Sequence, residues 1–173
     1  MWVFGYGSLL WNPGFDVAET VLARLPDYHR SFCMRSIHHR GSLANPGLVL
    51  ALDEAAGAAC LGVALRVASG AESDTLAYLR ERELVSAAYL EKNLRVDLTD
   101  GRRVDAVTYV IDRDHNQYCT LSLEQQAQII AQAVGGRGPN TEYLWNTASH
   151  LSQLGIEDAD LDWLSARVRN LCA

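Results

Sequence analysis

The chain has 173 residues and a composition typical of a globular protein. Apolar residues make up 49% of it and charged residues 21%, which argues against a disordered or fibrous chain. The formal net charge of −6 argues against a broad nucleic-acid-binding face. A chain of this size buries enough surface for a full core, so we predict a single domain over residues 1–173 and no nucleic-acid partner.

No part of the sequence is typical of a targeting segment or a metal centre. The N-terminal residues lack the basic and long apolar regions of a signal peptide, and the apolar runs at 48–52 and 107–111 are too short to span a bilayer. No two of the four cysteines have zinc-site or redox-motif spacing, and the histidines lack ligand-type partners four residues away on a helix. We therefore predict a cytoplasmic protein without membrane association, metal or cofactor.

The first part of the chain is predicted to form strands. Short apolar or alternating segments bounded by turn residues lie at 2–6, 21–25, 28–35, 48–53 and 60–67. Asn45-Pro46-Gly47 predicts a turn, and Glu54-Ala55-Ala56-Gly57 predicts a second turn that makes the last two segments a strand pair.

The rest of the chain mixes helices with one further strand pair. A helix is predicted over 72–84, then strands at 90–98 and 104–111, joined at Asp100-Gly101 by a two-residue hairpin loop. Three helices follow, at 127–134 after a capping box at 122–125, at 141–154 and at 159–171. This order predicts an α+β fold in which a mainly antiparallel, mixed sheet or partial barrel is flanked by helices.

The loop that follows the first predicted strand is one candidate binding element. It reads Tyr6-Gly7-Ser8-Leu9, and glycine lets the backbone turn sharply so that successive N–H groups can face an anion. Ser8 adds a hydroxyl group that can donate and accept hydrogen bonds. From spacing alone, an ordinary strand-to-turn transition is the favoured interpretation.

Glu83 is the candidate for acid–base chemistry. At about 100° per residue, it lies on the same helix face as Leu76 and Leu79, whereas Tyr78 and Glu81 point the other way. A carboxylate on an apolar face is costly to bury as an ion, so its pKa is expected to rise and it can serve as a general base or acid. The alternative is that the helix ends earlier, or that the neighbouring Arg80 or Arg82 pairs with the carboxylate.

Two other segments carry little signal by themselves. His38 and His39 are adjacent in a predicted loop, where extended neighbours point to opposite sides and make a poor metal site. Tyr143 falls in an ordinary amphipathic helix pattern, which is typical of a core tyrosine.

Taken together, four spaced blocks resemble the ChaC-like γ-glutamylcyclotransferases along nearly the whole chain. The blocks are Phe4-Gly5-Tyr6-Gly7-Ser8-Leu9-Leu10-Trp11, then His39-Arg40-Gly41 with Pro46-Gly47, then Tyr78-Leu79, Arg82-Glu83 and Tyr89, and finally Asn140, Glu142-Tyr143-Leu144 and Leu154-Gly155. One departure is Ala87-Ala88, where the family generally has paired glycines. The added methyl groups leave the fine choice of substrate open.

The resemblance implies a γ-glutamylcyclotransferase-like fold and an enzyme that converts glutathione to 5-oxoproline and Cys-Gly without metal, ATP or a covalent enzyme intermediate. It also implies roles for residues of this sequence. Glu83 would carry out both proton transfers, and the backbone N–H groups of Gly7, Ser8 and Leu9 would hold a carboxylate or the developing oxyanion. The predicted substrate contacts are completed by Tyr6, Tyr143 and, as a partner for the glycine carboxylate, Arg40.

Other functions stay open at this point. The same chemistry could act on other γ-glutamyl amines or dipeptides, which a comparison of substrates would reveal. A non-catalytic module that binds a γ-glutamyl metabolite has no use for Glu83, and a purely structural or interaction protein has support only from the amphipathic C-terminal helices.

Overall fold

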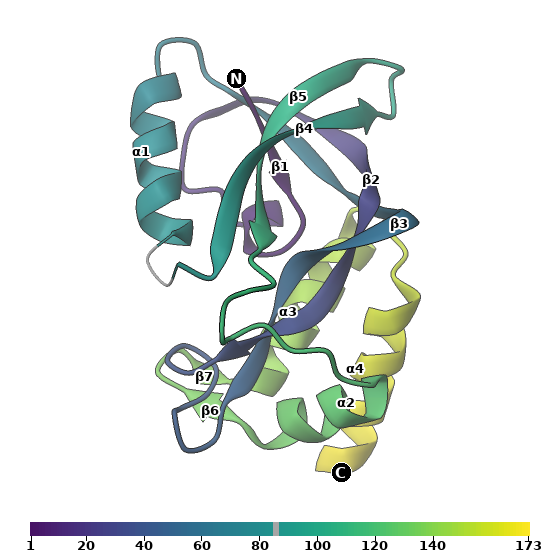
Figure 1. Ribbon diagram of the computed structural model, residues 1–173. Helices are drawn as coiled ribbons and strands as arrows, with labels where there is room; N and C mark the ends of the chain where they lie inside the picture. Colours follow the sequence, from purple (N-terminus) through teal and green to yellow (C-terminus); the bar gives the residue numbers. More distant parts are fainter. Residues whose placement is uncertain (85–86) are drawn as a thin grey trace. The chain divides into compact units, whose positions relative to one another are not determined.

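The computed structural model describes residues 1–84 and 87–173, which divide into two compact units (Figure 1). The first unit consists of Met1–Ser31 and Ala51–His115, and the second of Phe32–Leu50 and Asn116–Ala173. Because of this division, the single domain expected over residues 1–173 stays a prediction.

Five strands close into a barrel in the spatial order β1-β3-β2-β4-β5. β1 pairs antiparallel with β3 and parallel with β5, while β4 pairs antiparallel with β2 and with β5. The structure confirms the predicted α+β fold with a mainly antiparallel, mixed sheet, and the barrel is closed rather than partial. The strands are β1 (Trp2–Gly5), β2 (Val17–Ser36), β3 (Gly47–Val67), β4 (Tyr89–Leu98) and β5 (Arg103–Ile111).

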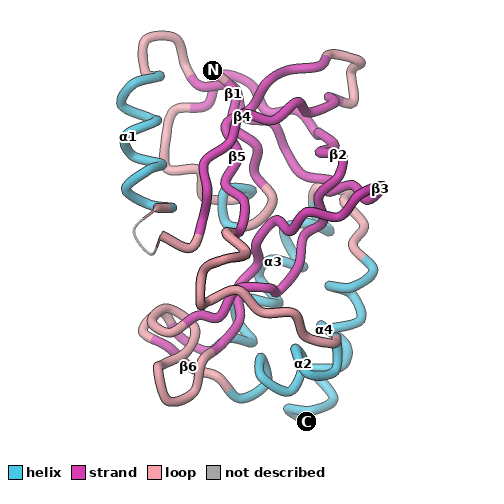
Figure 2. The backbone as a smooth tube through the Cα atoms, in the orientation of Figure 1, coloured by secondary structure: helices cyan, strands magenta, loops and turns pink. Residues whose placement is uncertain are grey.

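The first unit also holds the short 3-10 helix η1 (Ser8–Leu10) and helix α1 (Glu72–Glu83) (Figure 2). Apolar side chains that alternate along the strands fill the interior, since successive residues of a strand face opposite sides. Leu79 of α1 is fully buried with them. The buried set in this unit includes Val3, Phe4, Leu25, Leu52, Val96 and Ala106.

β2 and β3 are each one long strand where the sequence predicted two shorter segments. The predicted segments 48–53 and 60–67 belong to the single strand β3, so the turn at 54–57 and the strand pair are wrong. Asp27 of β2 and Gly57 of β3 have positive φ angles of 65° and 81°, and the Gly57 N–H donates to Asp27 Oδ1 at 3.0 Å. A residue in this conformation redirects a strand without ending it.

The predicted hairpin between β4 and β5 is confirmed, but its loop has a different form. The Gly101 N–H donates to the Leu98 carbonyl at 3.1 Å and the Leu98 N–H to the Arg102 carbonyl at 2.8 Å. Gly101 has a φ of 94°, whereas Asp100 is not among the described residues with positive φ. The loop is therefore a type I turn followed by a left-handed glycine, not the two-residue type I′ turn predicted.

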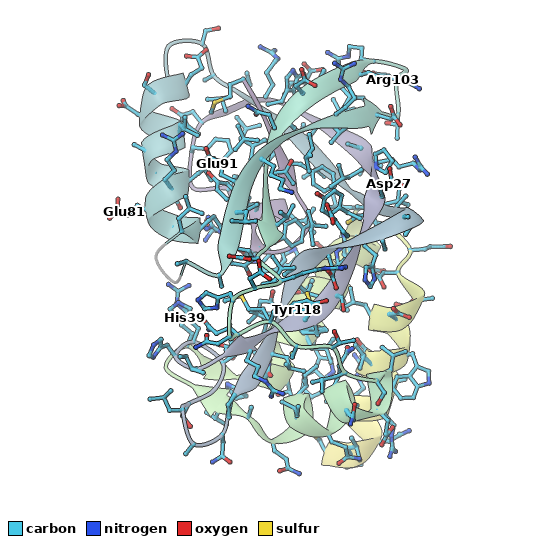
Figure 3. The ribbon with its side chains drawn as sticks, in the orientation of Figure 1. Asp27, His39, Glu81, Glu91, Arg103 and Tyr118 are labelled. Atoms are coloured by element: carbon cyan, nitrogen blue, oxygen red, sulfur yellow. The ribbon has the colours of Figure 1, made fainter. Side chains whose placement is uncertain are left out.

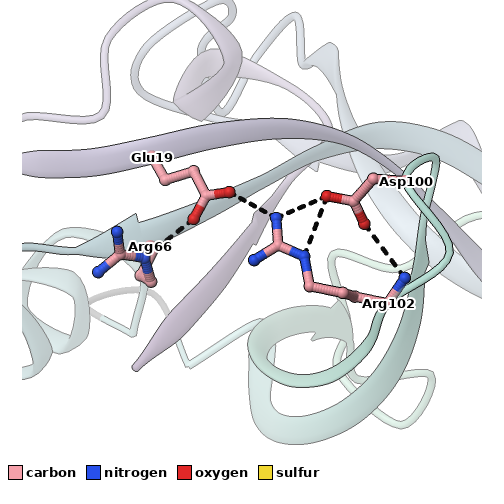
Figure 4. Close-up of polar contacts among 4 residues, drawn as sticks. All are labelled: Glu19, Arg66, Asp100 and Arg102. Carbon is pink, nitrogen blue, oxygen red and sulfur yellow. Dashed lines mark hydrogen bonds and ion pairs between the residues drawn. The ribbon is translucent and has the colours of Figure 1, made fainter.

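Ion pairs connect this hairpin to the neighbouring strands (Figure 4). Arg102 pairs with Asp100 in the hairpin and with Glu19 of β2, and Glu19 also accepts from Arg66 of β3 at 3.1 Å. Since these side chains are between about a third and half exposed, each pair stabilises the barrel only modestly.

The second unit contains helices α2 (Leu123–Gln132), α3 (Asn140–Gln153) and α4 (Ala159–Cys172), which pack on one another. The predicted capping box is present, since Ser122 and Gln125 exchange side-chain-to-backbone hydrogen bonds. The short strands β6 (Val134–Gly135) and β7 (Gly138–Pro139) pair with each other and were not predicted. Within the described residues, no helix has the length and apolar character needed to cross a membrane.

Candidate functional site

The loop after β1 makes a tight turn in the first unit. A Cβ on Gly5 would lie 3.2 Å from the Leu9 Cβ, so β1 ends on a residue that the packing keeps small. Tyr6 is buried, and its carbonyl accepts from Nε of the buried Arg30 at 2.7 Å. The first N–H groups of a helical turn have no partner within that turn, so the residues at the start of η1 are the ones whose N–H groups a ligand can use.

Glu83 is the last residue of α1, and its side chain is only 16% exposed. Burial raises the pKa of Glu83, and the charge of the neighbouring Arg82 offsets part of this effect. Among the residues that the structure describes, Arg82 is the one basic group within ion-pair distance, with Nε 3.4 Å from Glu83 Oε1. The predicted shielded carboxylate is confirmed, and so is part of the alternative, because Arg82 pairs with it.

Tyr78 and Glu81, both predicted to point away from Glu83, differ in exposure. Glu81 is exposed and points away from α1 into solvent (Figure 3), but Tyr78 is half-buried. The Tyr78 hydroxyl accepts from Arg82 Nη1 at 3.2 Å and packs against Gly14, where a Cβ would lie 2.1 Å from the same oxygen. Helical spacing placed Tyr78 opposite Glu83, but Arg82 reaches it because residues four apart are neighbours on a helix.

Arg82 links the end of α1 to the loop after β1. Its Nη2 donates to Ser8 Oγ at 2.8 Å, and its Nη1 donates to the Asn12 carbonyl at 2.7 Å. One guanidinium group therefore contacts both Ser8 and Glu83, two residues predicted to contribute to the site. Sequence reasoning named Arg82 as a residue that could pair with Glu83 and as part of the third sequence block. The link to Ser8 depends on tertiary structure and has no signature in the sequence.

A second carboxylate, Glu91 of β4, lies near α1 and has the opposite character (Figure 3). Arg80 donates to both of its oxygens at 3.0 and 3.1 Å, and the hydroxyl of the buried Tyr109 donates to it at 2.8 Å. The hydrogen bonds from Arg80, and to a smaller extent from Tyr109, lower the pKa of Glu91. Sequence reasoning did not single out this group.

In the second unit, Arg40 lies beside the start of α3. Its Nη1 donates to the Pro139 carbonyl at 3.1 Å and lies 3.8 Å from Glu142 Oε2, while its guanidinium carbon sits 5.8 Å from the centre of the Tyr143 ring. The structure thus brings together two of the predicted substrate contacts, Arg40 and Tyr143. Arg40 already has an acidic neighbour, Glu142, so a substrate carboxylate would share the Arg40 guanidinium with Glu142.

Tyr143 and Asn140 fix the start of α3 against β3. Asn140 is fully buried, and its side-chain amide exchanges two hydrogen bonds of 2.8 Å with the backbone of Leu48. The Tyr143 hydroxyl accepts from the Leu50 N–H at 3.1 Å, and its ring packs edge-on against Phe32. Two residues of the fourth sequence block therefore hold α3 against β3 in this unit, although Tyr143 is half-buried rather than part of the core.

The predicted site residues thus form two groups, one in each unit. Tyr6, Gly7, Ser8 and Leu9 are contiguous in the first unit, where Arg82 connects Ser8 to Glu83. Arg40 and Tyr143 are neighbours in the second unit.

The histidines of the predicted loop do not gather with other ligand-type side chains. Burial, together with the charge of Arg137, lowers the pKa of His39 and favours its neutral form. Over residues 1–84 and 87–173, no three His, Cys, Asp or Glu side chains come close enough to hold a metal ion.

Comparisons with known proteins identify relatives over the whole sequence. Residues 1–171 match the family described as ChaC-like protein. A protein of Escherichia coli (strain K12) named glutathione-specific gamma-glutamylcyclotransferase is 37% identical over 174 residues, covering 100% of this chain and 74% of that protein. A Schizosaccharomyces pombe protein of the same name is 31% identical, covering 93% of this chain and 87% of the relative.

Solved structures show the same fold. A crystal structure of a glutathione-specific γ-glutamyl cyclotransferase from yeast superposes with a TM-score of 0.87 at 22% identity, covering 98% of this chain and 96% of that one. A structure named gamma-glutamyl cyclotransferase gives a TM-score of 0.61 at 18% identity, covering 95% and 86%. With the family match over nearly every residue and relatives above 30% identity, the chain belongs to the ChaC-like family, as its four sequence blocks predicted.

Proposed function

We propose that this protein cyclises the γ-glutamyl group of glutathione and releases 5-oxoproline and Cys-Gly. Membership of the ChaC-like family supports this reaction, as do relatives whose names specify glutathione. The observation that carries the proposal is the shielded carboxylate of Glu83, which ends α1 and is joined through Arg82 to the loop after β1.

The reaction depends on positioning the substrate and on proton transfer more than on a cofactor. The α-amine nitrogen of the substrate forms a bond to its own γ-carbonyl carbon, and the amide bond to Cys-Gly breaks. No water is added and no electrons are exchanged, so the balance closes once one proton moves from the attacking nitrogen to the departing nitrogen. Intramolecular attack gains strongly from a bound conformation that holds the two reacting atoms together.

Glu83 is suited to carry that proton. As a carboxylate it accepts the proton from the α-amine while the ring closes, and as a carboxylic acid it then donates to the leaving nitrogen. A carboxyl group of ordinary pKa would be a weak donor in the second step, whereas burial raises the pKa of Glu83 above its usual range. This role requires no second acid.

The predicted substrate contacts stay part of the proposal. The backbone N–H groups of Gly7, Ser8 and Leu9 would bind the α-carboxylate or stabilise the oxyanion that develops on the γ-carbonyl. Tyr6 would contact the substrate beside these N–H groups. Arg40 and Tyr143 are proposed to contact the substrate as well, with Arg40 as the partner of the glycine carboxylate.

Replacing Glu83 by glutamine tests the proposal, with Glu81→Gln as the matched control. Glu83→Gln keeps the size of the side chain but removes its basicity, so turnover of glutathione should fall about 10²- to 10⁴-fold. Glu81 lies on the same helix and is exposed, so its substitution should leave turnover unchanged. Chromatographic detection of 5-oxoproline and Cys-Gly measures both, and near-wild-type release by Glu83→Gln would end the proposal.

Substrate choice is a separate part of the proposal. The departure from the family pattern at Ala87-Ala88 motivates a comparison of glutathione with γ-glutamyl-alanine and γ-glutamyl-lysine. Faster release of 5-oxoproline from a dipeptide would point to that class of substrate, and binding without any product would point to a metabolite-binding module. A cytoplasmic location and the absence of a nucleic-acid partner also stay predictions.

A further inference from the structure

All three nitrogens of the Arg82 guanidinium group make polar contacts. Besides Ser8 and the Asn12 carbonyl, it donates from Nη1 to the Pro13 carbonyl at 3.2 Å. The Tyr78 hydroxyl accepts from the same nitrogen, and Nε faces Glu83 at 3.4 Å. The side chain is 19% exposed, so these contacts are made with little competition from water.

We propose that Arg82 is a positioning residue that fixes the place of the Glu83 carboxylate relative to the proposed substrate-binding turn at Ser8. The inference rests on the proposed role of Glu83 and extends it to how that role is organised. α1 and the turn after β1 are separated by more than 60 residues of chain, and Arg82, near the end of α1, joins them by its hydrogen bond to Ser8 while its Nε lies 3.4 Å from the carboxylate of the adjacent Glu83. If the turn shifted relative to α1, the hydrogen bond from Arg82 to Ser8 would be lost.

Arginine is suited to this position for a geometric reason. Its planar group presents five N–H donors in a fixed fork, so one side chain can set the directions of several acceptors at once. The contacts use Nε toward Glu83, Nη2 toward Ser8 and Nη1 toward the backbone at Asn12. Lysine keeps the charge, but its single nitrogen cannot reproduce this spread of directions.

The charge of Arg82 also affects the protonation of Glu83. Its positive charge lowers the pKa of Glu83 against the larger effect of burial. Among the described residues, the other titratable group that interacts electrostatically with Glu83 is Tyr109 of β5, which is held by Glu91 and lies near Arg80. Burial and the hydrogen bond to Glu91 raise the pKa of Tyr109, so Tyr109 stays neutral across the working range and does not replace the charge of Arg82.

The test compares Arg82→Gln with Arg82→Lys, using pH profiles of kcat/KM for glutathione. Glutamine removes both the charge and the fork, so we expect kcat to fall about 10²-fold because a misplaced base costs that much. We also expect the acid limb of the profile to move up by about one pH unit, because the charge that favours ionised Glu83 is gone. Arg82→Lys keeps the positive charge, so its acid limb should move much less than that of Arg82→Gln. Its kcat should still be reduced, because the fork of donors is lost.

A matched control and a folding check make the result decisive. Arg95 is 63% exposed and pairs with Asp105 away from these groups, so Arg95→Gln should leave both kcat and the acid limb unchanged. Thermal unfolding shows whether each variant folds, and where Arg82→Gln does not fold, Arg82→Lys alone decides through its kcat. A folded Arg82→Gln with an unshifted acid limb, or an Arg82→Lys with wild-type kcat, would overturn the positioning role.

These outcomes are distinct from a failure of the proposed function. If Glu83→Gln retains activity, Glu83 is not the proton carrier, and the comparison at Arg82 loses its basis. If Glu83→Gln is inactive and the Arg82 variants behave like wild type, the proton carrier stands and only its positioning by Arg82 is refuted.

Discussion

The end of α1 and the start of β4 each carry a glutamate in a partly shielded place, yet the two carboxylates have opposite properties. Glu83 is 16% exposed and faces one guanidinium nitrogen at 3.4 Å, and burial raises its pKa. Glu91 is 24% exposed and accepts hydrogen bonds from Arg80 and Tyr109, which lower its pKa. The protonation of each carboxylate therefore follows from two things, its burial and the number of aligned hydrogen-bond donors, and burial dominates at Glu83 whereas donors dominate at Glu91.

The same contrast separates a chemical role from a structural one. A carboxylate saturated with donors is a stable ion and a poor proton carrier, whereas one that is shielded and sparsely bonded can exchange a proton near neutral pH. Glu91 thus fits a structural role between α1 and the barrel, and Glu83 fits proton transfer.

The two groups should also affect stability with opposite pH dependence. The raised pKa of Glu83 means that its ionisation opposes folding, so its contribution is most favourable below the ordinary carboxyl pKa and is lost as pH rises through the folded-state pKa. The lowered pKa of Glu91 means that its contribution is present above the ordinary pKa and is lost as pH falls through the folded-state pKa.

Removing the Glu91 carboxylate should have the larger effect on stability. Glu91→Ala breaks the pair with the half-exposed Arg80 and leaves the buried Tyr109 hydroxyl without its acceptor, so we expect a loss of about 2 kcal/mol in the free energy of unfolding. Urea denaturation at pH 7 measures it. Adding Tyr109→Phe should recover part of the loss, because the stranded hydroxyl is then absent, and an additive second loss would contradict the structural role of Glu91.

A smaller effect is expected in the segment that joins the two regions. Ala87 has a φ of 56°, a left-handed conformation that favours glycine. Ala87→Gly should raise the free energy of unfolding by about 0.5–1 kcal/mol. Ala88 is fully buried and has no positive φ, so Ala88→Gly is the control and should lower stability. A loss of stability in Ala87→Gly would show that the methyl group contributes packing that outweighs the strain.

The fold was largely predictable where local chemistry decides the structure. The capping box at Ser122 and the glycine after α3 marked helix ends correctly, because both act within a few residues of the boundary. The separately predicted segments of β2, and those of β3, each belong to one strand. The turn residues at 54–57 indicate a strand end by themselves, whereas the contact of Gly57 with Asp27 joins residues distant in the chain.

The site was predictable to a similar extent. The helical spacing of Leu76, Leu79 and Glu83 was enough to identify a shielded carboxylate, because it depends on the period of one helix. The contacts of Arg82 with Ser8, and of Glu91 with Tyr109, join residues distant in the chain and require the folded structure.

The most direct test of the account is the titration of Glu83 itself, followed in the intact protein by NMR of carboxyl groups labelled with carbon-13 and assigned with Glu83→Gln. We expect a midpoint above the ordinary glutamate value of about 4.3. We also expect kcat/KM for glutathione to fall with the same midpoint as pH decreases, because a protonated Glu83 cannot accept the proton of the α-amine. A midpoint at or below the ordinary value, or an acid limb of kcat/KM at a different pH, would contradict it.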